Sequence, residues 1–115
     1  MPHLTVEYTQ NLKTKVNMPL ILEKLHSSLK VAPGIEMNRV KSRLIHTDRV
    51  IVDSDAVEIH MIHVTAYILT GRDVQTRKLY GEILFEELMK QASFIPDISL
   101  TVEVREMERA SYFRN

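Results

Sequence analysis

Residues 2–8 read PHLTVEY, and this stretch alternates in the way that predicts a β-strand with one buried face. Successive side chains of a strand point to opposite faces of a sheet. One face of this strand is apolar and carries Leu4, Val6 and Tyr8. The other face is more polar and carries His3, Thr5 and Glu7. The chain therefore begins with an element that needs an apolar layer on one side.

Helical sequence follows the first strand. Asn17 is a plausible N-cap, Pro19 falls in the first helical turn, and an apolar stripe follows at Leu22, Leu25 and Leu29. The APG sequence at residues 32–34 ends that helix. Residues 38–52, NRVKSRLIHTDRVIV, return as β-branched sequence. The first part of the chain thus predicts a strand, a helix and a second strand.

The same order recurs in the second half. Residues 56–69 form a β-rich run, and Asp73 in the turn TGRD is the predicted N-cap of a helix over residues 74–91. We expect this helix to bury Leu79, Ile83 and Leu88. Residues 95–97, IPD, end it, and residues 98–107 alternate as a last strand. We also expect the rings of Phe85, Phe94 and Phe113 to be ordinary packing residues.

An offset of about sixty residues aligns the two halves, pairing Pro2 with Ile62, Ile35 with Ile95 and Val40 with Leu100. We interpret this as an α+β fold, a tandem β-α-β duplication that forms a four-stranded mixed sheet with two helices on one face. Residues 1–115 would form a single domain, with repeat one at about 2–57 and repeat two at about 58–115. The other face of the sheet needs a cover, which favours association through the sheets.

The composition narrows the function classes. The chain has 115 residues, with 15 basic and 15 acidic side chains. Its formal net charge is zero, so its charge does not favour nucleic acid as a partner. The absence of cysteine excludes disulfides and thiolate chemistry. No apolar run is long enough to span a membrane and no leader pattern is visible, so we expect a cytoplasmic protein with no membrane partner. His60 and His63 would face opposite sides of a strand, so we predict no metal site.

Pro2 is the candidate with a distinctive chemistry. A proline behind the initiator is small enough to allow removal of Met1, which would leave a secondary amine at the end of the chain. An unperturbed terminal amine has a pKa of about 7.7–8.0, so in water it is largely protonated and a poor base. Burial and neighbouring guanidinium groups would lower that pKa and make the amine a usable base.

Three stretches together carry a resemblance to a known family: PHLTVEY at residues 2–8, VKSRLIH at 40–46 and TGRDVQTRKLYGEILFEELMK at 70–90. They resemble the tautomerase superfamily, whose members are built from a duplicated β-α-β unit and use an N-terminal proline. Within it, the closest resemblance is to the 5-carboxymethyl-2-hydroxymuconate isomerases. The similarity covers nearly the whole chain.

The resemblance implies a cofactor-independent isomerase, or tautomerase, that converts an enol or dienol carboxylic acid to its keto form in aromatic-acid catabolism, here homoprotocatechuate degradation. It implies a homotrimer, a small-molecule carboxylate as substrate, and Pro2 as the general base once Met1 is removed. No cofactor is expected.

The resemblance also implies the substrate-binding residues. Arg43 matches the arginine of the family's second strand, and Arg72 matches the arginine of its Gly-Arg turn. Guanidinium groups bind carboxylates through two parallel hydrogen bonds and can stabilise a developing dienolate. Lys41 stands where the isomerases more often have a second arginine, and His3 is a further substrate-edge group.

Two alternatives remain at this point. One is another tautomerase-superfamily activity, such as hydrolysis of a halogenated acrylate, which would need an acidic residue to activate water. Glu103 is a candidate for that role only by its position in the repeat. The other is a trimeric binding module without catalytic activity.

Overall fold

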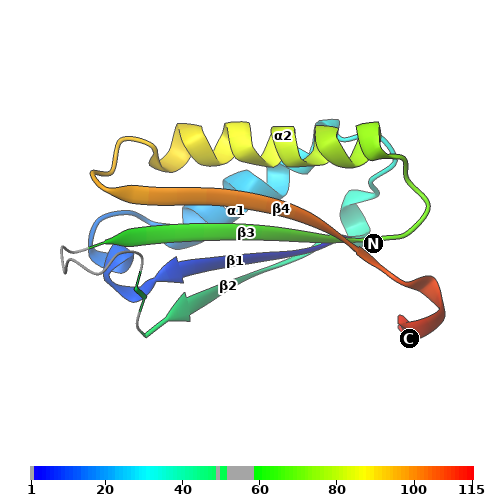
Figure 1. Ribbon diagram of the computed structural model, residues 1–115, viewed down its shortest axis with the longest axis horizontal. Coiled ribbons are helices and arrows are strands. Elements are labelled where there is room, and N and C mark those ends of the chain that lie inside the picture. The colour runs from blue at the N-terminus through cyan, green and yellow to red at the C-terminus, as the bar shows by residue number, and fades with distance from the viewer. Residues whose placement is uncertain (1, 49, 52–58) are drawn as a thin grey trace.

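The computed structural model describes residues 2–48, 50–51 and 59–115. Its strands and helices follow in the order β1 (His3–Thr9), α1 (Met18–Ser28), β2 (Lys41–Thr47), β3 (His60–Leu69), α2 (Val74–Ala92) and β4 (Ile98–Met107). The four strands form one sheet in the order β2-β1-β3-β4. β1 and β2 are parallel, β3 and β4 are parallel, and β1 and β3 are antiparallel (Figure 1).

The strand register confirms the tandem duplication. His3 lies opposite Lys41, and His60 lies opposite Ile98, so the two strands of each parallel pair are offset by the same 38 positions. Thr5 lies directly opposite Thr65 at the junction of β1 with β3. The predicted fold class, a four-stranded mixed sheet built from two β-α-β units, is therefore correct.

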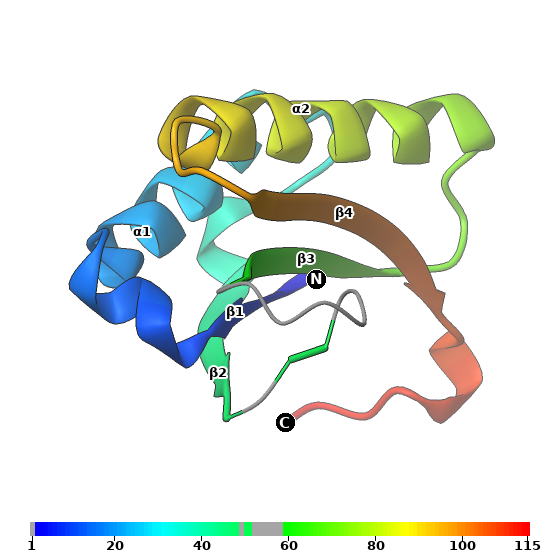
Figure 2. The ribbon, with the colours of Figure 1, turned by 60° about the vertical axis from the view of Figure 1, so that its left-hand side comes forward.

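Both helices cover the same face of the sheet, as Figures 1 and 2 show from two directions. Between this face and the helices lies the core, whose side chains include Leu4, Val6, Leu25, Ile62, Val64, Leu84 and Leu88. We call the other side of the sheet the open face. On β1 it carries the predicted polar residues His3, Thr5 and Glu7, and the C-terminal segment after β4 lies on this side (Figure 2).

The predicted helix starts are confirmed by their caps. The Asn17 side chain accepts a hydrogen bond from the Leu20 N–H at 3.1 Å, and the Asp73 carboxylate accepts one from the Thr76 N–H at 2.8 Å. These contacts satisfy backbone donors that have no partner inside the helix. The caps fix where α1 and α2 begin, and with them the loops that lead into each helix.

Two expectations about side chains were wrong, one for Leu79 on α2 and one for three phenylalanine rings. Of the three α2 residues expected to be buried, Leu88 is buried, Ile83 is partly buried against the core, and Leu79 is exposed. The buried stripe has i, i+4 spacing and consists of Tyr80, Leu84, Leu88 and Ala92. The polar hydroxyl of Tyr80 can be buried because it donates a hydrogen bond to the Pro33 carbonyl. The aromatic rings expected to pack are largely exposed, by 42% for Phe85, 70% for Phe94 and 87% for Phe113.

The second strand is also shorter than its β-branched sequence indicates. Residues 37–39 form a 3₁₀ turn, and β2 begins only at Lys41 and ends at Thr47. Residues 52–58, with the boundary between the repeats, lie outside the described residues. In the part of the chain that the structure describes, no helix combines the length and apolar character needed to cross a membrane.

Candidate functional site

Pro2 is buried and fixed in the sheet. Its carbonyl accepts a hydrogen bond from the Lys41 N–H at 3.1 Å, which extends the ladder between β1 and β2 by one residue. Alternation along the strand puts Pro2 on the same side as Leu4, toward the helices. Pro2, directly before β1, is therefore held in position, whereas an unpaired terminus would be frayed.

His3 and Arg43 lie together on the open face. Thr5 of β1 is the partner of Arg43 on β2, which places the guanidinium next to the imidazole two residues earlier on β1. Both terminal nitrogens of Arg43 approach Nδ1 of His3, at 3.4 and 3.3 Å. On the other side of the ring, Nε2 lies 2.7 Å from the Tyr112 hydroxyl, and the two rings meet edge to face.

The electrostatic environment favours the neutral form of His3. Burial lowers the pKa of His3 below its ordinary value, and the positive charges of Arg43 and Lys41 lower it further. A guanidinium can only donate hydrogen bonds, so Nδ1 of the neutral ring must be the acceptor. The ring proton then sits on Nε2 and is donated to the Tyr112 oxygen.

A cavity of about 520 Å³ opens over this cluster. Arg43, His3 and Tyr112 lie in its wall together with Thr5, Glu7, Ile45, Tyr67 and Met107. The lining combines a positive group, hydrogen-bonding side chains and apolar surface. That combination suits a small organic anion.

Arg72 occupies a different part of the structure. Its Nη2 donates to the Gly34 carbonyl at 2.9 Å, and its guanidinium carbon lies 5.6 Å from the centre of the Tyr80 ring. These contacts place the side chain on the helix-covered side of the sheet, away from the cavity on the open face. Because β3 is antiparallel to β1, the chain after Leu69 lies at the end of the sheet where β1 begins. Arg72 and Pro2 therefore share this end.

The three cationic side chains predicted to bind substrate, Lys41, Arg43 and Arg72, differ from other arginines in whether a carboxylate pairs with them. Arg39 pairs with Glu36 at 2.9 Å, Arg77 with Glu106 at 3.5 Å and Arg105 with Glu103 at 2.7 Å. Among the described residues, no carboxylate lies within ion-pair distance of Lys41, Arg43 or Arg72. Three uncompensated cations near the start of β1 provide a suitable environment for a carboxylate.

Tyr112 is the residue that sequence reasoning missed. It comes from the segment after β4 and reaches His3 across 109 positions of sequence. Arg109 anchors the same segment, because its Nε donates to the Thr70 carbonyl at 2.9 Å. No local motif marks this contact, and the only signal was a tyrosine in a short polar tail.

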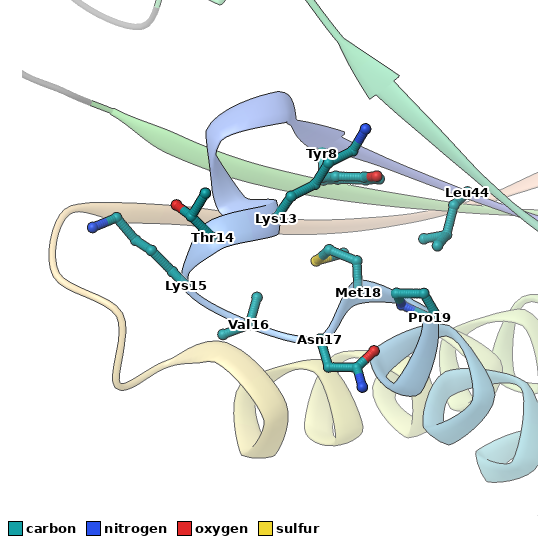
Figure 3. A pocket seen from close by; sticks show the side chains of 9 residues that line it. All are labelled: Tyr8, Lys13, Thr14, Lys15, Val16, Asn17, Met18, Pro19 and Leu44. Atoms are coloured by element: carbon teal, nitrogen blue, oxygen red, sulfur yellow. The ribbon is translucent and has the colours of Figure 1, made fainter.

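A second cavity of about 580 Å³ lies at the opposite end of β1 (Figure 3). It is lined by Tyr8, Lys13, Thr14, Lys15, Val16, Asn17, Met18, Pro19 and Leu44. It contains none of the predicted site residues. Pro2 lies at the other end of the strand.

Two further sequence predictions concern Met1 and a metal site. Met1, whose removal the proline chemistry requires, lies outside the described residues. Within residues 2–48, 50–51 and 59–115, no three His, Asp or Glu side chains are arranged to hold a metal ion.

Comparison with known proteins gives a consistent family. The family model described as 5-carboxymethyl-2-hydroxymuconate isomerase matches residues 2–115. The Escherichia coli protein named 5-carboxymethyl-2-hydroxymuconate Delta-isomerase is 23% identical over 117 residues, covering 99% of this chain and 93% of that protein.

Solved structures agree on the fold. The crystal structure of a 5-carboxymethyl-2-hydroxymuconate isomerase from Deinococcus radiodurans R1 has a TM-score of 0.86 and 28% identity, covering 99% of this chain and 88% of that one. A structure described as a fused 4-OT wild type symmetric trimer has a TM-score of 0.72 and 17% identity, with 97% and 90% coverage. The second likeness concerns the fold alone.

Proposed function

The chain belongs to the 5-carboxymethyl-2-hydroxymuconate isomerase family of the tautomerase superfamily, and on that basis we propose that Pro2 is its general base and an enol or dienol carboxylic acid its substrate. The protein is an isomerase of this family's type. The observation that carries the proposal is the position of Pro2, which is buried and hydrogen-bonded to Lys41 at the start of β1. Homoprotocatechuate degradation in the cytoplasm is the pathway we propose for it.

The proposed base is the secondary amine that Pro2 presents once Met1 is removed. This amine must be neutral to accept a proton, and two effects favour the neutral form. Pro2 is buried, and the cations that lower the pKa of neighbouring His3 lie within reach of the same strand end. Both burial and nearby positive charge disfavour an ammonium ion. The amine is then poised to act near neutral pH.

The reaction moves one proton and shifts two double bonds. The Pro2 amine takes the proton from the dienol hydroxyl, the oxygen lone pair forms the carbonyl, and the conjugated electron pairs shift toward the distant carbon. The prolinium then returns the proton to that carbon, which restores the neutral amine. No atoms are gained or lost, and no external oxidant or reductant is required.

Arg72 and Arg43 are the proposed ligands of the substrate carboxylates. Arg72 donates one hydrogen bond to a neutral carbonyl, that of Gly34, so its positive charge is not compensated there. Arg43 contacts the neutral His3 ring and likewise retains its charge. A carboxylate would gain charge-assisted hydrogen bonds from either guanidinium. Lys41 would contribute as a point charge.

We further propose a single domain that assembles as a homotrimer through the open face. In the described part of the chain no helix covers this face, and it carries both polar and apolar side chains, including Thr65 and Tyr67. A sheet exposed on one face gains stability when a second layer covers it. The description of the fused 4-OT relative as a symmetric trimer supports the same assembly.

The chemical state of the terminus offers a direct test. Protein whose intact mass corresponds to a chain starting at Pro2 should isomerise 2-hydroxymuconate, and protein with an added N-terminal residue should not. In the form that starts at Pro2 the proline nitrogen is an amine, whereas in the extended form it is an amide, which cannot act as a base. Equal turnover by both forms would rule out the proline mechanism.

A further inference from the structure

We propose that the Tyr112 hydroxyl is a second hydrogen-bond donor, beside the Arg43 guanidinium, in a subsite for a substrate carboxylate that is remote from the reacting enol. The proposal rests on the proposed function, because it assigns a binding group to that substrate. Tyr112 and Arg43 both contact His3, from opposite sides of its ring, and all three side chains line the cavity on the open face.

The hydrogen bonds leave a free donor on Tyr112. Arg43 donates to Nδ1 of His3, so the Nε2–H is donated to the Tyr112 oxygen at 2.7 Å. A phenol oxygen that accepts a hydrogen bond still carries its own proton. Among the residues that the structure describes, His3 is the hydrogen-bond partner of the hydroxyl. The Tyr112 proton is therefore available to a ligand oxygen in the cavity.

The C-terminal segment positions this donor. Arg109 donates to the Thr70 carbonyl at 2.9 Å, and residues 109–111 form a 3₁₀ turn that leads directly into Tyr112. The Tyr112 N–H closes that turn on the Arg109 carbonyl at 3.4 Å. The ring is thus held both through the backbone and through its contact with His3. A donor fixed in this way loses little freedom when a ligand binds.

The charge of the cavity lining differs from one end to the other. Arg43, His3 and Tyr112 form its cationic end, whereas Glu7 lies four residues along β1 on the same face. At about 3.3 Å per residue, roughly 13 Å of strand separates Glu7 from His3. Ile45, Tyr67 and Met107 supply apolar surface to the same cavity. One carboxylate fits the end of the cavity that carries Arg43, and the second carboxylate of a diacid must lie away from Glu7, which would repel it.

The second repeat does not reproduce the subsite. The register that places Arg43 opposite Thr5 places Glu103 opposite Thr65. Glu103 is paired with Arg105 at 2.7 Å, so this half of the sheet presents a compensated charge. In the described strands, the second repeat therefore has no counterpart of this subsite.

Adipate, a saturated dicarboxylate that cannot tautomerise, is a suitable probe, and calorimetric titration measures its binding without turnover. The Tyr112→Phe variant keeps the ring against His3 and removes only the hydroxyl. We expect its affinity for adipate to fall about tenfold, the scale of one charge-assisted hydrogen bond. The matched control is Tyr8→Phe, whose ring lies at the other end of β1 on the helix-covered side, and its affinity should match the unaltered protein.

Adipate binding is also measured in the Pro2→Ala variant, because binding, unlike turnover, does not require the base. Adipate affinity that depends on Tyr112 supports the subsite whether or not Pro2 proves to be the base. Unchanged affinity in Tyr112→Phe, with a circular dichroism spectrum equal to that of the unaltered protein, would overturn it. The ¹⁵N shifts of the His3 imidazole provide an independent readout, because the proposal requires the proton on Nε2 and a proton on Nδ1 would contradict it.

Discussion

The imidazole Nε2 of His3 lies 2.7 Å from the hydroxyl of Tyr112, which joins the first strand to the C-terminal segment. Arg43 reaches the same ring from β2 at 3.3 Å. The neutral imidazole of His3 thus contacts both the Arg43 guanidinium and the Tyr112 hydroxyl, and Pro2 directly precedes His3 in the chain. This arrangement relates the proposed base to the proposed carboxylate ligands and leads to the following predictions.

Replacing Arg43 should weaken substrate binding selectively. In Arg43→Gln the guanidinium is lost, and we expect KM for a dicarboxylate enol to rise at least tenfold, because a charge-assisted contact is removed. The control is Arg39→Gln, since Arg39 is already paired with Glu36 and lies outside the cavity. Steady-state kinetics of both variants measure the difference. An equal change in KM for the two variants would mean that Arg43 acts only through net charge.

Acid should destabilise the fold through His3. Its pKa is lowered in the native state by burial and by the charges of Arg43 and Lys41, so the native protein binds fewer protons than the unfolded chain. The free energy of unfolding therefore rises with pH up to about 6.5, the ordinary pKa of histidine, and this contribution is lost as pH falls below that value. Urea unfolding at fixed protein concentration, over a series of pH values, measures the slope.

His3→Gln is the variant that tests this assignment. It removes the titrating ring, so the pH dependence of its unfolding free energy below about pH 6.5 should be shallower than that of the unaltered protein. Parallel pH profiles for the two proteins would exclude His3 as the source.

The stability of the turn whose carbonyl accepts the Arg72 hydrogen bond should depend on Gly34. Gly34 has φ of 76°, a conformation that side chains with a Cβ rarely adopt, and its carbonyl accepts the Arg72 hydrogen bond. We expect Gly34→Ala to destabilise the protein by about 1–2 kcal/mol. The matched control is Gly81→Ala inside α2, where the added Cβ would meet Val104 at an ordinary 3.6 Å. Alanine there should stabilise the helix by about 0.5–1 kcal/mol.

Chemical unfolding of the two variants should therefore give changes of opposite sign. Destabilisation of both by the same amount would show that the Gly34 backbone conformation is not the cause.

The proposed assembly through the open face can be broken at its centre. Thr65 is buried on this face opposite Thr5, and Thr65→Glu places an unpaired charge there. We expect sedimentation analysis to find trimers for the unaltered protein and smaller species for this variant. Gln75→Glu, which adds the same charge on the exposed side of α2, should remain trimeric. Persistence of trimers in Thr65→Glu would place the interface elsewhere.

The sequence contained most of the information about the fold, because its signals are local or periodic. Alternation in residues 2–8 and 98–107, and the caps at Asn17 and Asp73, act within a few residues and were interpreted correctly. On α2, Leu88 was interpreted correctly and Leu79 was not, because the buried stripe includes Tyr80, whose hydroxyl bonds to the Pro33 carbonyl, far away in sequence.

The candidate site was harder to predict for the same reason. Pro2, His3, Lys41 and Arg43 follow from adjacent strands, and the register brings them together. Tyr112 joins them only because the C-terminal segment turns back at Arg109 to the open face, a contact with no local pattern. Arg72 is at the same end of the sheet, but its contacts to Gly34 and Tyr80 could not be deduced from spacing.

The most direct test of the central claim is the ultraviolet rate of ketonisation of 2-hydroxymuconate by protein whose mass shows that Met1 is absent, measured beside Pro2→Ala. We predict ready turnover that falls at least about a hundredfold in the variant, the scale of a positioned general base. Turnover in Pro2→Ala at the rate of the unaltered protein would contradict this mechanism, because the buried proline would then take no part in the reaction.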